Sequence, residues 1–126
     1  MRANITCKED TEMLKLDILV VRRADMTHRQ FVEYWRDRHG PFFASQPIVK
    51  KTVRRYVQSR TMTDTPAGLS VGPYDGIAQI WFDDVSGFLE YLHSSNYTEI
   101  IRPDEERITD PHKVQFLFSE ETPIIG

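Results

Sequence analysis

Apolar residues recur at helical spacing between residues 25 and 45, in the stretch DMTHRQFVEYWRDRHGPFFAS. Phe31, Trp35 and His39 follow one another at intervals of four, so they share one face of a helix. Thr27 and Gln30 have the spacing of a capping box, in which each side chain accepts a hydrogen bond from the backbone amide of the other residue. The pattern therefore predicts a helix that begins at Thr27 and carries His39 on its aromatic face.

The Gly40-Pro41 pair predicts the end of this helix, because proline disfavours helical geometry in the preceding residue and glycine can close a helix. His39 is then expected in the last turn. Burial beside aromatic rings favours its neutral form, whereas the carbonyl groups at a helix end favour the cation. Such an imidazole suits proton transfer near neutral pH. The alternative is a structural histidine that caps the last carbonyl groups.

Four further segments show the alternation or apolar content of strands: residues 13–23, 52–61, 75–82 and 112–119. Asp84 can cap a second helix, in which Phe88, Leu89 and Leu92 have helical spacing. Residues 62–73 are rich in glycine and proline and form a loop of a length typical of lids. Residues 1–12 are expected to be a flexible tail, and residues 13–126 a single domain. The order β-α-β-β-α-β predicts an α+β, ferredoxin-like fold with one antiparallel four-stranded sheet.

The strands are apolar on both faces at residues 18–21, 80–82 and 116–118. Two helices can cover only one face of the sheet, so the second face needs another partner. We expect a homodimer in which two sheets pack together as a barrel with the helices outside.

Composition excludes several classes of protein. With 126 residues, 40% hydrophobic and 28% charged residues and a net charge of -3, the chain resembles an ordinary globular protein, and nothing indicates a nucleic-acid partner. Its single cysteine, Cys7, cannot form an internal disulfide, which favours the reducing cytoplasm. We expect neither a signal peptide nor a membrane-spanning segment, because no apolar run is long enough.

Several short motifs resemble the EthD family of dimeric α/β-barrel proteins, over residues 14–125. They are Tyr34-Trp35, His39-Gly40-Pro41, Arg55-Tyr56-Val57-Gln58, Tyr74-Asp75-Gly76 and Trp81-Phe82-Asp83. The resemblance implies a ferredoxin-like subunit and a homodimer, without metal or nucleotide. The wider superfamily includes polyketide cyclases, lactone isomerases, decarboxylases, and haem or quinol oxygenases. Many members have Glu where this chain has Gln79, so a carboxylate base at that position is absent here.

In subunits of this kind the ligand cavity lies between the sheet and its helices. We expect His39 to act there as acid or base, with Tyr56 stabilising negative charge on the substrate. Asp17 could orient the imidazole, or it could pair with Lys15 or Arg54, and Tyr56 could instead be a core residue. The expected substrate-binding residues are Phe31, Trp35, Phe42, Phe43, Gln79, Trp81, Phe88 and His93.

No metal site is expected, because the four histidines are widely separated and none forms an HxH or HxxxH pair. No cofactor is expected either, although haem ligation by His39 or His93 stays open. The predicted function is that of a cofactor-independent lyase, cyclase or isomerase acting on an aromatic polyketide-like or lactone compound. The alternatives are a non-catalytic accessory dimer that binds a small molecule, and a cofactor-free or haem-assisted monooxygenase of the same fold.

Overall fold

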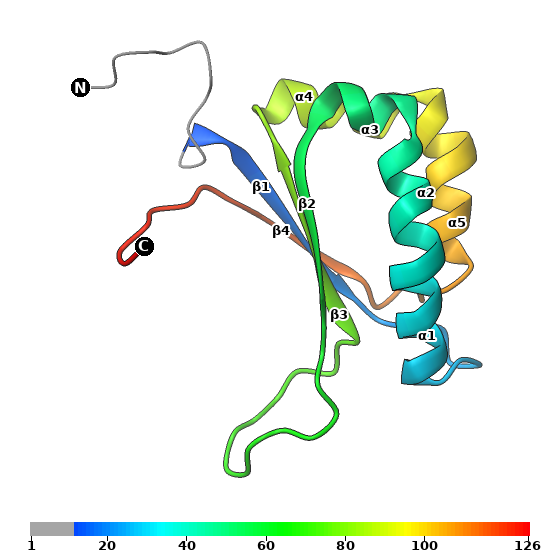
Figure 1. The fold of residues 1–126 in the computed structure, drawn as a ribbon, viewed down its shortest axis with the longest axis vertical. Coiled ribbons are helices and arrows are strands. Elements are labelled where there is room, and N and C mark those ends of the chain that lie inside the picture. The colour runs from blue at the N-terminus through cyan, green and yellow to red at the C-terminus, as the bar shows by residue number, and fades with distance from the viewer. Residues whose placement is uncertain (1–11) are drawn as a thin grey trace.

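The computed structural model describes residues 12–126, so most of the predicted tail, including Cys7, lies outside the described residues. The chain combines four strands with helical segments (Figure 1), and two of these segments, η2 and η3, are π-helical turns. In chain order the elements are β1 (Leu14–Val20), α1 (His28–Tyr34), η2 (Trp35–His39), α2 (Gly40–Ser45), α3 (Pro47–Thr52), β2 (Val53–Arg60), β3 (Gly76–Phe82), α4 (Val85–His93), η3 (Tyr97–Ile101), α5 (Arg102–Glu106) and β4 (Gln115–Ser119).

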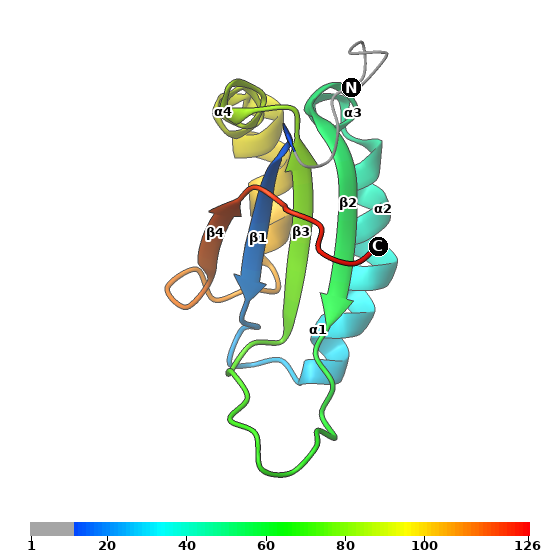
Figure 2. The same cartoon turned by 90° about the vertical axis from the view of Figure 1, so that its left-hand side faces the viewer.

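The four strands form one antiparallel sheet in the order β2-β3-β1-β4, and the helices cover one of its faces (Figures 1 and 2). This is the predicted ferredoxin-like arrangement, which is confirmed. Side chains alternate between the two faces of a strand, so the register decides which residues meet the helices. Leu16 pairs with Ile80 on the helix side, whereas Asp17 pairs with Gln79 on the opposite, outer face.

The first helix begins as predicted, with the capping box of Thr27 and Gln30 formed in both directions. Its predicted end at Gly40 is wrong. Gly40 has right-handed helical angles, φ -56° and ψ -58°, and the helix continues through α2. The amide of Gly40 donates to the carbonyl of Trp35, five residues earlier, which defines a wider π turn. This wider turn accommodates Pro41, whose ring would collide with the preceding turn of a regular α-helix.

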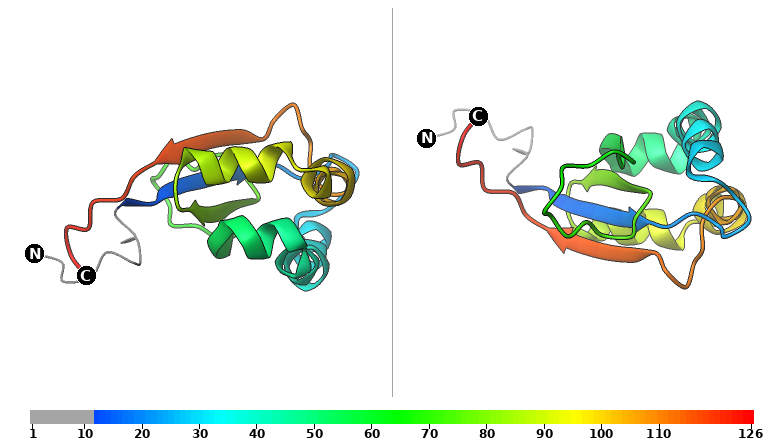
Figure 3. Two further views of the ribbon diagram at one scale, coloured as in Figure 1. Left: turned by 90° about the horizontal axis from the view of Figure 1, so that it is seen from above. Right: turned by 90° about the horizontal axis from the view of Figure 1, so that it is seen from below.

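A π turn followed by a proline also occurs in the second helical column, which consists of η3 and α5. The amide of Arg102 donates to the carbonyl of Tyr97, and Pro103 follows directly. The columns α1–η2–α2 and η3–α5 therefore lie side by side against the sheet (Figure 1), and Figure 3 shows their ends next to each other, away from the C-terminus. The first π turn ends at His39, and the second is followed three residues later by Asp104. Both residues belong to the site described below.

The core consists of two adjoining clusters of buried side chains. One lies around Phe43, Ile80 and Phe82, and the other around Phe31 and Trp35. Ile18 and Tyr56 pack against both clusters, so they mark the place where the clusters meet. None of the helices formed by the described residues is both long and apolar enough to cross a membrane.

Candidate active site

A cavity of about 70 Å³ lies where the two core clusters meet, between the sheet and the two helical columns. Its wall is mostly apolar and includes one exposed aromatic residue, Phe116, on the edge strand β4. Four polar residues also line it: His39, Tyr56, Glu105 and Thr109. The apolar lining comes from Ile18, Val20, Trp35, Phe43, Ala78, Ile80, Ile108, Val114 and Phe116. Convergent polar groups in an apolar pocket are typical of binding and active sites.

His39 and Asp104 form the central polar contact of the site. Nδ1 of His39 lies 2.7 Å from Oδ2 of Asp104, and the other carboxylate oxygen accepts a 2.5 Å hydrogen bond from the hydroxyl of Tyr34. A carboxylate can only accept, so Nδ1 of His39 carries the hydrogen and Nε2 carries the lone pair. Among the described residues nothing binds Nε2, which leaves this nitrogen able to accept a proton from a ligand in the cavity.

The protonation of His39 follows from its burial, since the residue is only 4% exposed. Burial lowers the pKa of His39, although the hydrogen bond and the charge of Asp104 oppose this shift. The imidazole is therefore neutral at neutral pH. The expected influence of a helix end is absent, because the helix continues beyond His39 to Ser45.

Tyr56 projects from β2 and presents a hydrogen-bond donor. Its hydroxyl accepts from Nε2 of Gln58 at 2.9 Å, and the same amide nitrogen donates to the carbonyl of Trp35 at 2.8 Å. The hydroxyl hydrogen has no acceptor among the described residues, so it can point to a ligand. Burial raises the pKa of Tyr56, which keeps the hydroxyl protonated.

Glu105 is an ionisable cavity residue that the sequence did not reveal, since the acidic residues 104–106 look like a solvated helix start. One carboxyl oxygen, Oε1, accepts from the hydroxyl of Tyr97 at 2.9 Å. Burial raises the pKa of Glu105 to about 7. Ile101 and Ile108, both fully buried, are four residues before Glu105 and three after it, and this helical spacing could have indicated an inward-facing carboxyl group.

Of the predicted site residues, the structure brings four together around the cavity: Trp35, His39, Phe43 and Tyr56. Three others lie on the outer face of the sheet, so their predicted place in the cavity is wrong. Asp17 pairs in register with Gln79 there, and Trp81 donates to Glu121 of the C-terminal segment, which crosses this face (Figure 2). Asp104 therefore holds the position beside the imidazole that was expected of Asp17.

The remaining four predicted binding residues lie outside the cavity as well. Phe31 is fully buried against Trp35, and Phe88 packs between Phe82 and Phe118. Phe42 is half-buried and does not line the cavity, and His93 is exposed at the end of α4. Helical spacing correctly indicated an apolar face in each helix, but that face is wider than the cavity.

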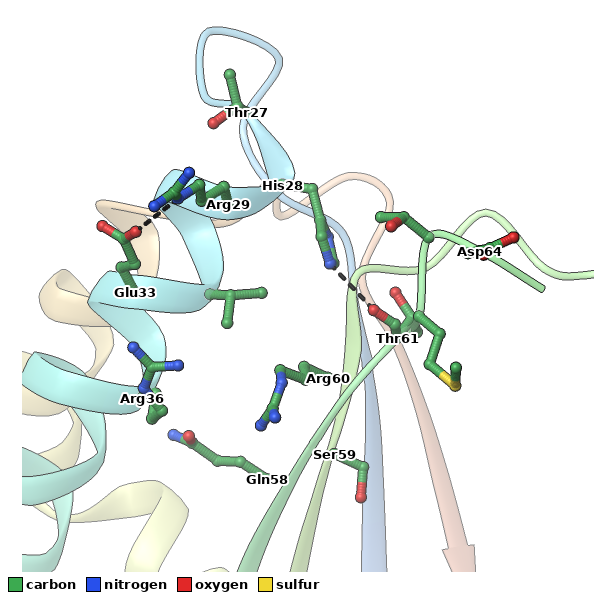
Figure 4. Close-up of a pocket in the computed structure, with 13 residues that line it drawn as sticks. Thr27, His28, Arg29, Glu33, Arg36, Gln58, Ser59, Arg60, Thr61 and Asp64 are labelled. Carbon is green, nitrogen blue, oxygen red and sulfur yellow. Dashed lines mark hydrogen bonds and ion pairs between the residues drawn. The ribbon is translucent and has the colours of Figure 1, made fainter.

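A larger hollow of about 1050 Å³ opens beside α1 and the end of β2 (Figure 4). Arg36, Gln58 and Arg60 point into it, and His28 contacts the carbonyl of Thr61 at 3.1 Å. This hollow is an open groove, and two of its arginine residues are neutralised, Arg29 by Glu33 and Arg36 by Asp37. We therefore place the candidate active site in the enclosed cavity.

Two other features bear on the chemistry of the cavity. Across residues 12–126, no group of three or more His, Cys, Asp or Glu side chains could hold a metal ion. The predicted lid, residues 62–73, extends away from the helices and contributes no residue to the cavity (Figure 1). The arrangement can accept a proton at His39 and donate a hydrogen bond from Tyr56, in surroundings that exclude most water.

Comparison with known proteins identifies relatives of this fold. The EthD domain model matches residues 23–112. An EthD family protein from Bacillus halodurans superposes with a TM-score of 0.64 at 17% identity, covering 87% of this chain and 99% of that one. A dimeric protein of unknown function and ferredoxin-like fold from Bacteroides fragilis superposes with a TM-score of 0.57 at 12% identity, covering 87% of this chain and 97% of that one. The hydroxynitrile lyase of Passiflora edulis superposes with a TM-score of 0.65 at 13% identity, covering 92% of this chain and 99% of that one. No curated protein matches the sequence.

Proposed function

The chain belongs to the EthD domain family, and from this premise we propose that it is a cofactor-independent lyase, cyclase or isomerase that transfers protons on a small aromatic or lactone compound. The observation that carries the proposal is the contact between His39 and Asp104 at the cavity. The carboxylate holds the imidazole in one orientation and in the tautomer that has a free Nε2. The lyase activity of the Passiflora edulis relative gives the fold a precedent for this chemistry.

In the proposed reaction, Nε2 of His39 removes a proton from an acidic carbon or hydroxyl group of the substrate. The electron pair that is left moves toward the adjacent carbonyl group, and the hydroxyl of Tyr56 donates a hydrogen bond to the oxygen on which negative charge develops. Asp104 stabilises the imidazolium that forms, because its charge lies 2.7 Å from Nδ1. Return of the proton at another position completes an isomerisation, and loss of a leaving group completes an elimination.

The cavity also limits how the substrate binds. A volume of about 70 Å³ is small beside the roughly 300–1,000 Å³ of ordinary ligand pockets, so it holds the reacting group and not a whole aromatic substrate. The rest of the molecule would extend past Phe116, which is 56% exposed and lines the cavity. Its ring offers a flat apolar surface for the aromatic or lactone part.

The test is to incubate the purified protein, without added cofactor, with a panel of hydroxynitriles, lactones and aromatic β-keto acids, and to follow products by mass spectrometry. His39→Gln keeps a group that can donate to Asp104 but cannot accept a proton, and it should lower the rate by a factor on the order of a hundred or more. His93→Gln, on the exposed end of α4, is the matched control and should keep full activity.

Unimpaired turnover by a folded His39→Gln variant would contradict the assignment. Binding of panel members without conversion would favour the accessory binding protein instead. Oxygen consumption during turnover would favour a monooxygenase. In the binding protein His39 would be structural, and its replacement would then lower the melting temperature, whereas replacement of a catalytic residue often leaves stability unchanged.

We further propose that two subunits associate through the outer face of the sheet. This face carries Leu19, Val57 and Ile77, which are only half-buried, and Leu117, which is 53% exposed. The dimeric relative from Bacteroides fragilis supports the assembly. A cytoplasmic location belongs to the same proposal, because the sequence has a single cysteine.

A further inference from the structure

Glu105 supplies the cavity with a second group that can exchange a proton. The residue lines the cavity together with His39 and Tyr56, and its Oε1 is held by the hydroxyl of Tyr97. Among the described residues no donor or acceptor binds its other oxygen, Oε2. A carboxyl group with one anchored oxygen and one free oxygen can donate a proton in a defined direction.

The two neighbouring carboxyl groups of α5 have different surroundings. Both oxygens of Asp104 accept hydrogen bonds, one from His39 and one from Tyr34. Glu105 faces apolar residues and the aromatic side chains of three elements, Tyr56 of β2, Tyr91 of α4 and Tyr97 of η3. Burial among these side chains favours the protonated form of Glu105, which suits a proton donor.

We propose that Glu105 donates a proton to the substrate oxygen while His39 removes one from the substrate carbon. This inference rests on the proposed function and names the second proton-transfer group of the same site. The carbon–hydrogen bond breaks, its proton goes to Nε2 of His39, and its electron pair forms the carbon–carbon double bond of an enol. The carbonyl oxygen receives the proton of Glu105, so Glu105 becomes a carboxylate as His39 becomes an imidazolium. The return transfers restore both groups.

The charged and titratable groups around Glu105 define when it holds a proton. Asp104 and Glu106, on the same helix, raise its pKa, and burial raises it further, whereas Arg102 and the hydroxyl of Tyr97 lower it. At a pKa of about 7 both forms are present near neutral pH, as an efficient proton donor requires. Activity should therefore decline on the alkaline side as Glu105 loses its proton.

The test is the pH dependence of kcat for a substrate found in the panel above. Glu105→Gln keeps an oxygen that can accept from Tyr97 but has no acidic proton, so kcat should fall by a factor on the order of a hundred and the alkaline decline should disappear. Tyr97→Phe removes a hydrogen bond that stabilises the carboxylate, so the alkaline decline should move to higher pH. Glu99→Gln, the same change at an exposed position of η3, is the matched control and should keep the profile.

The outcomes separate this inference from the proposed function. An unchanged alkaline decline and full kcat in Glu105→Gln, together with an inactive His39→Gln, would overturn the role of Glu105 and leave the role of His39 intact. An unimpaired His39→Gln would overturn both. Loss of activity in Glu105→Gln with the Tyr97→Phe profile unshifted would mean that Glu105 only shapes the cavity, and would overturn the proton transfer.

Discussion

At the scale of single residues, burial moves His39 and Glu105 to their neutral forms, with opposite effects of pH on stability. Burial lowers the pKa of His39, so its contribution is present above the ordinary value of 6.5 and is lost as the pH falls below it. The pKa of Glu105 is raised from 4.5 to about 7. Its contribution is therefore complete below 4.5 and is lost as the pH rises toward 7.

Glu105→Gln tests this balance without any substrate. In the wild type, Glu105 should lower the free energy of unfolding by on the order of 2 kcal/mol between about pH 5 and about pH 8. The amide of Glu105→Gln cannot lose a proton, so the variant should not show this part of the decline. Urea unfolding of the wild type, Glu105→Gln and the exposed control Glu99→Gln at both pH values measures this difference. Equal pH dependence in all three proteins would show that the proton on Glu105 is not linked to folding.

Gly76 is required by the close approach of Trp35 to β3. A Cβ atom at this position would lie 2.7 Å from Cζ3 of Trp35 and 3.1 Å from the carbonyl oxygen of Ser59. Trp35 is 3% exposed and cannot move away easily, so Gly76→Ala should destabilise the fold by about 1–3 kcal/mol.

The matched control is Gly87→Ala in α4, where the added Cβ lies 3.7 Å from the nearest atom, a carboxylate oxygen of Asp84. Alanine favours helix at such a position, so this variant should be as stable as the wild type or more stable by up to about 1 kcal/mol. Thermal melting compares the two variants. Equal melting temperatures would mean that the Trp35 side chain can move to accommodate the added Cβ atom, and that Gly76 is not needed for packing.

At the scale of elements, the two π turns bring the site together. They allow each helix to pass a proline, and they place His39 and Asp104 in contact across the two columns. Gln58 ties this arrangement to the sheet, because its side-chain amide donates both to the carbonyl of Trp35 in η2 and to the hydroxyl of Tyr56.

Gln58→Leu should therefore affect both stability and activity. The lost hydrogen bonds should cost about 1–2 kcal/mol, and the hydroxyl of Tyr56 should lose its orientation, which lowers turnover. Gln79→Leu is the same chemical change on the outer face of the sheet and should leave turnover unchanged. Denaturant unfolding and rate measurements on both variants decide the matter. If the two variants behave alike, Gln58 does not position Tyr56.

Sequence could predict the start of the first helix but not its path. The capping box is a local signal, and it formed as expected. Gly40-Pro41 is also a local signal for a helix end, but contacts distant in sequence oppose it, namely the bond from Gln58 to Trp35 and the burial of Phe43. The carboxylate partner of His39 was missed for the same reason, since 65 residues separate it from Asp104.

The faces of the sheet set a second limit on prediction. Alternation correctly separates Asp17 from its neighbours, but both faces carry apolar residues, so the pattern alone cannot say which face meets the helices. The register of β1 with β3 decides which face of β1 meets the helices. Leu16 and Ile80 face the helices as a pair, and this places Asp17, Gln79 and Trp81 outside.

At the scale of the whole molecule, the outer face of the sheet should determine assembly. Leu117→Arg places a cation opposite Asp17 within the subunit, where it can be neutralised, but a second sheet could not cover it without large cost. We predict that the wild type sediments as a dimer and Leu117→Arg as a folded monomer. Leu89→Arg, on the exposed side of α4, should remain dimeric. A monomeric wild type, or a dimeric Leu117→Arg, would exclude this interface.

The central claim is that His39 is a neutral base with its lone pair on Nε2, and nitrogen NMR of the imidazole tests it most directly. Spectra of ¹⁵N-histidine protein, assigned with His39→Gln, should show hydrogen on Nδ1 and none on Nε2 at neutral pH, with protonation only below the ordinary pKa of 6.5. Asp104→Asn should abolish this preference for one tautomer. An imidazolium at neutral pH, or a hydrogen on Nε2 in the wild type, would contradict the account.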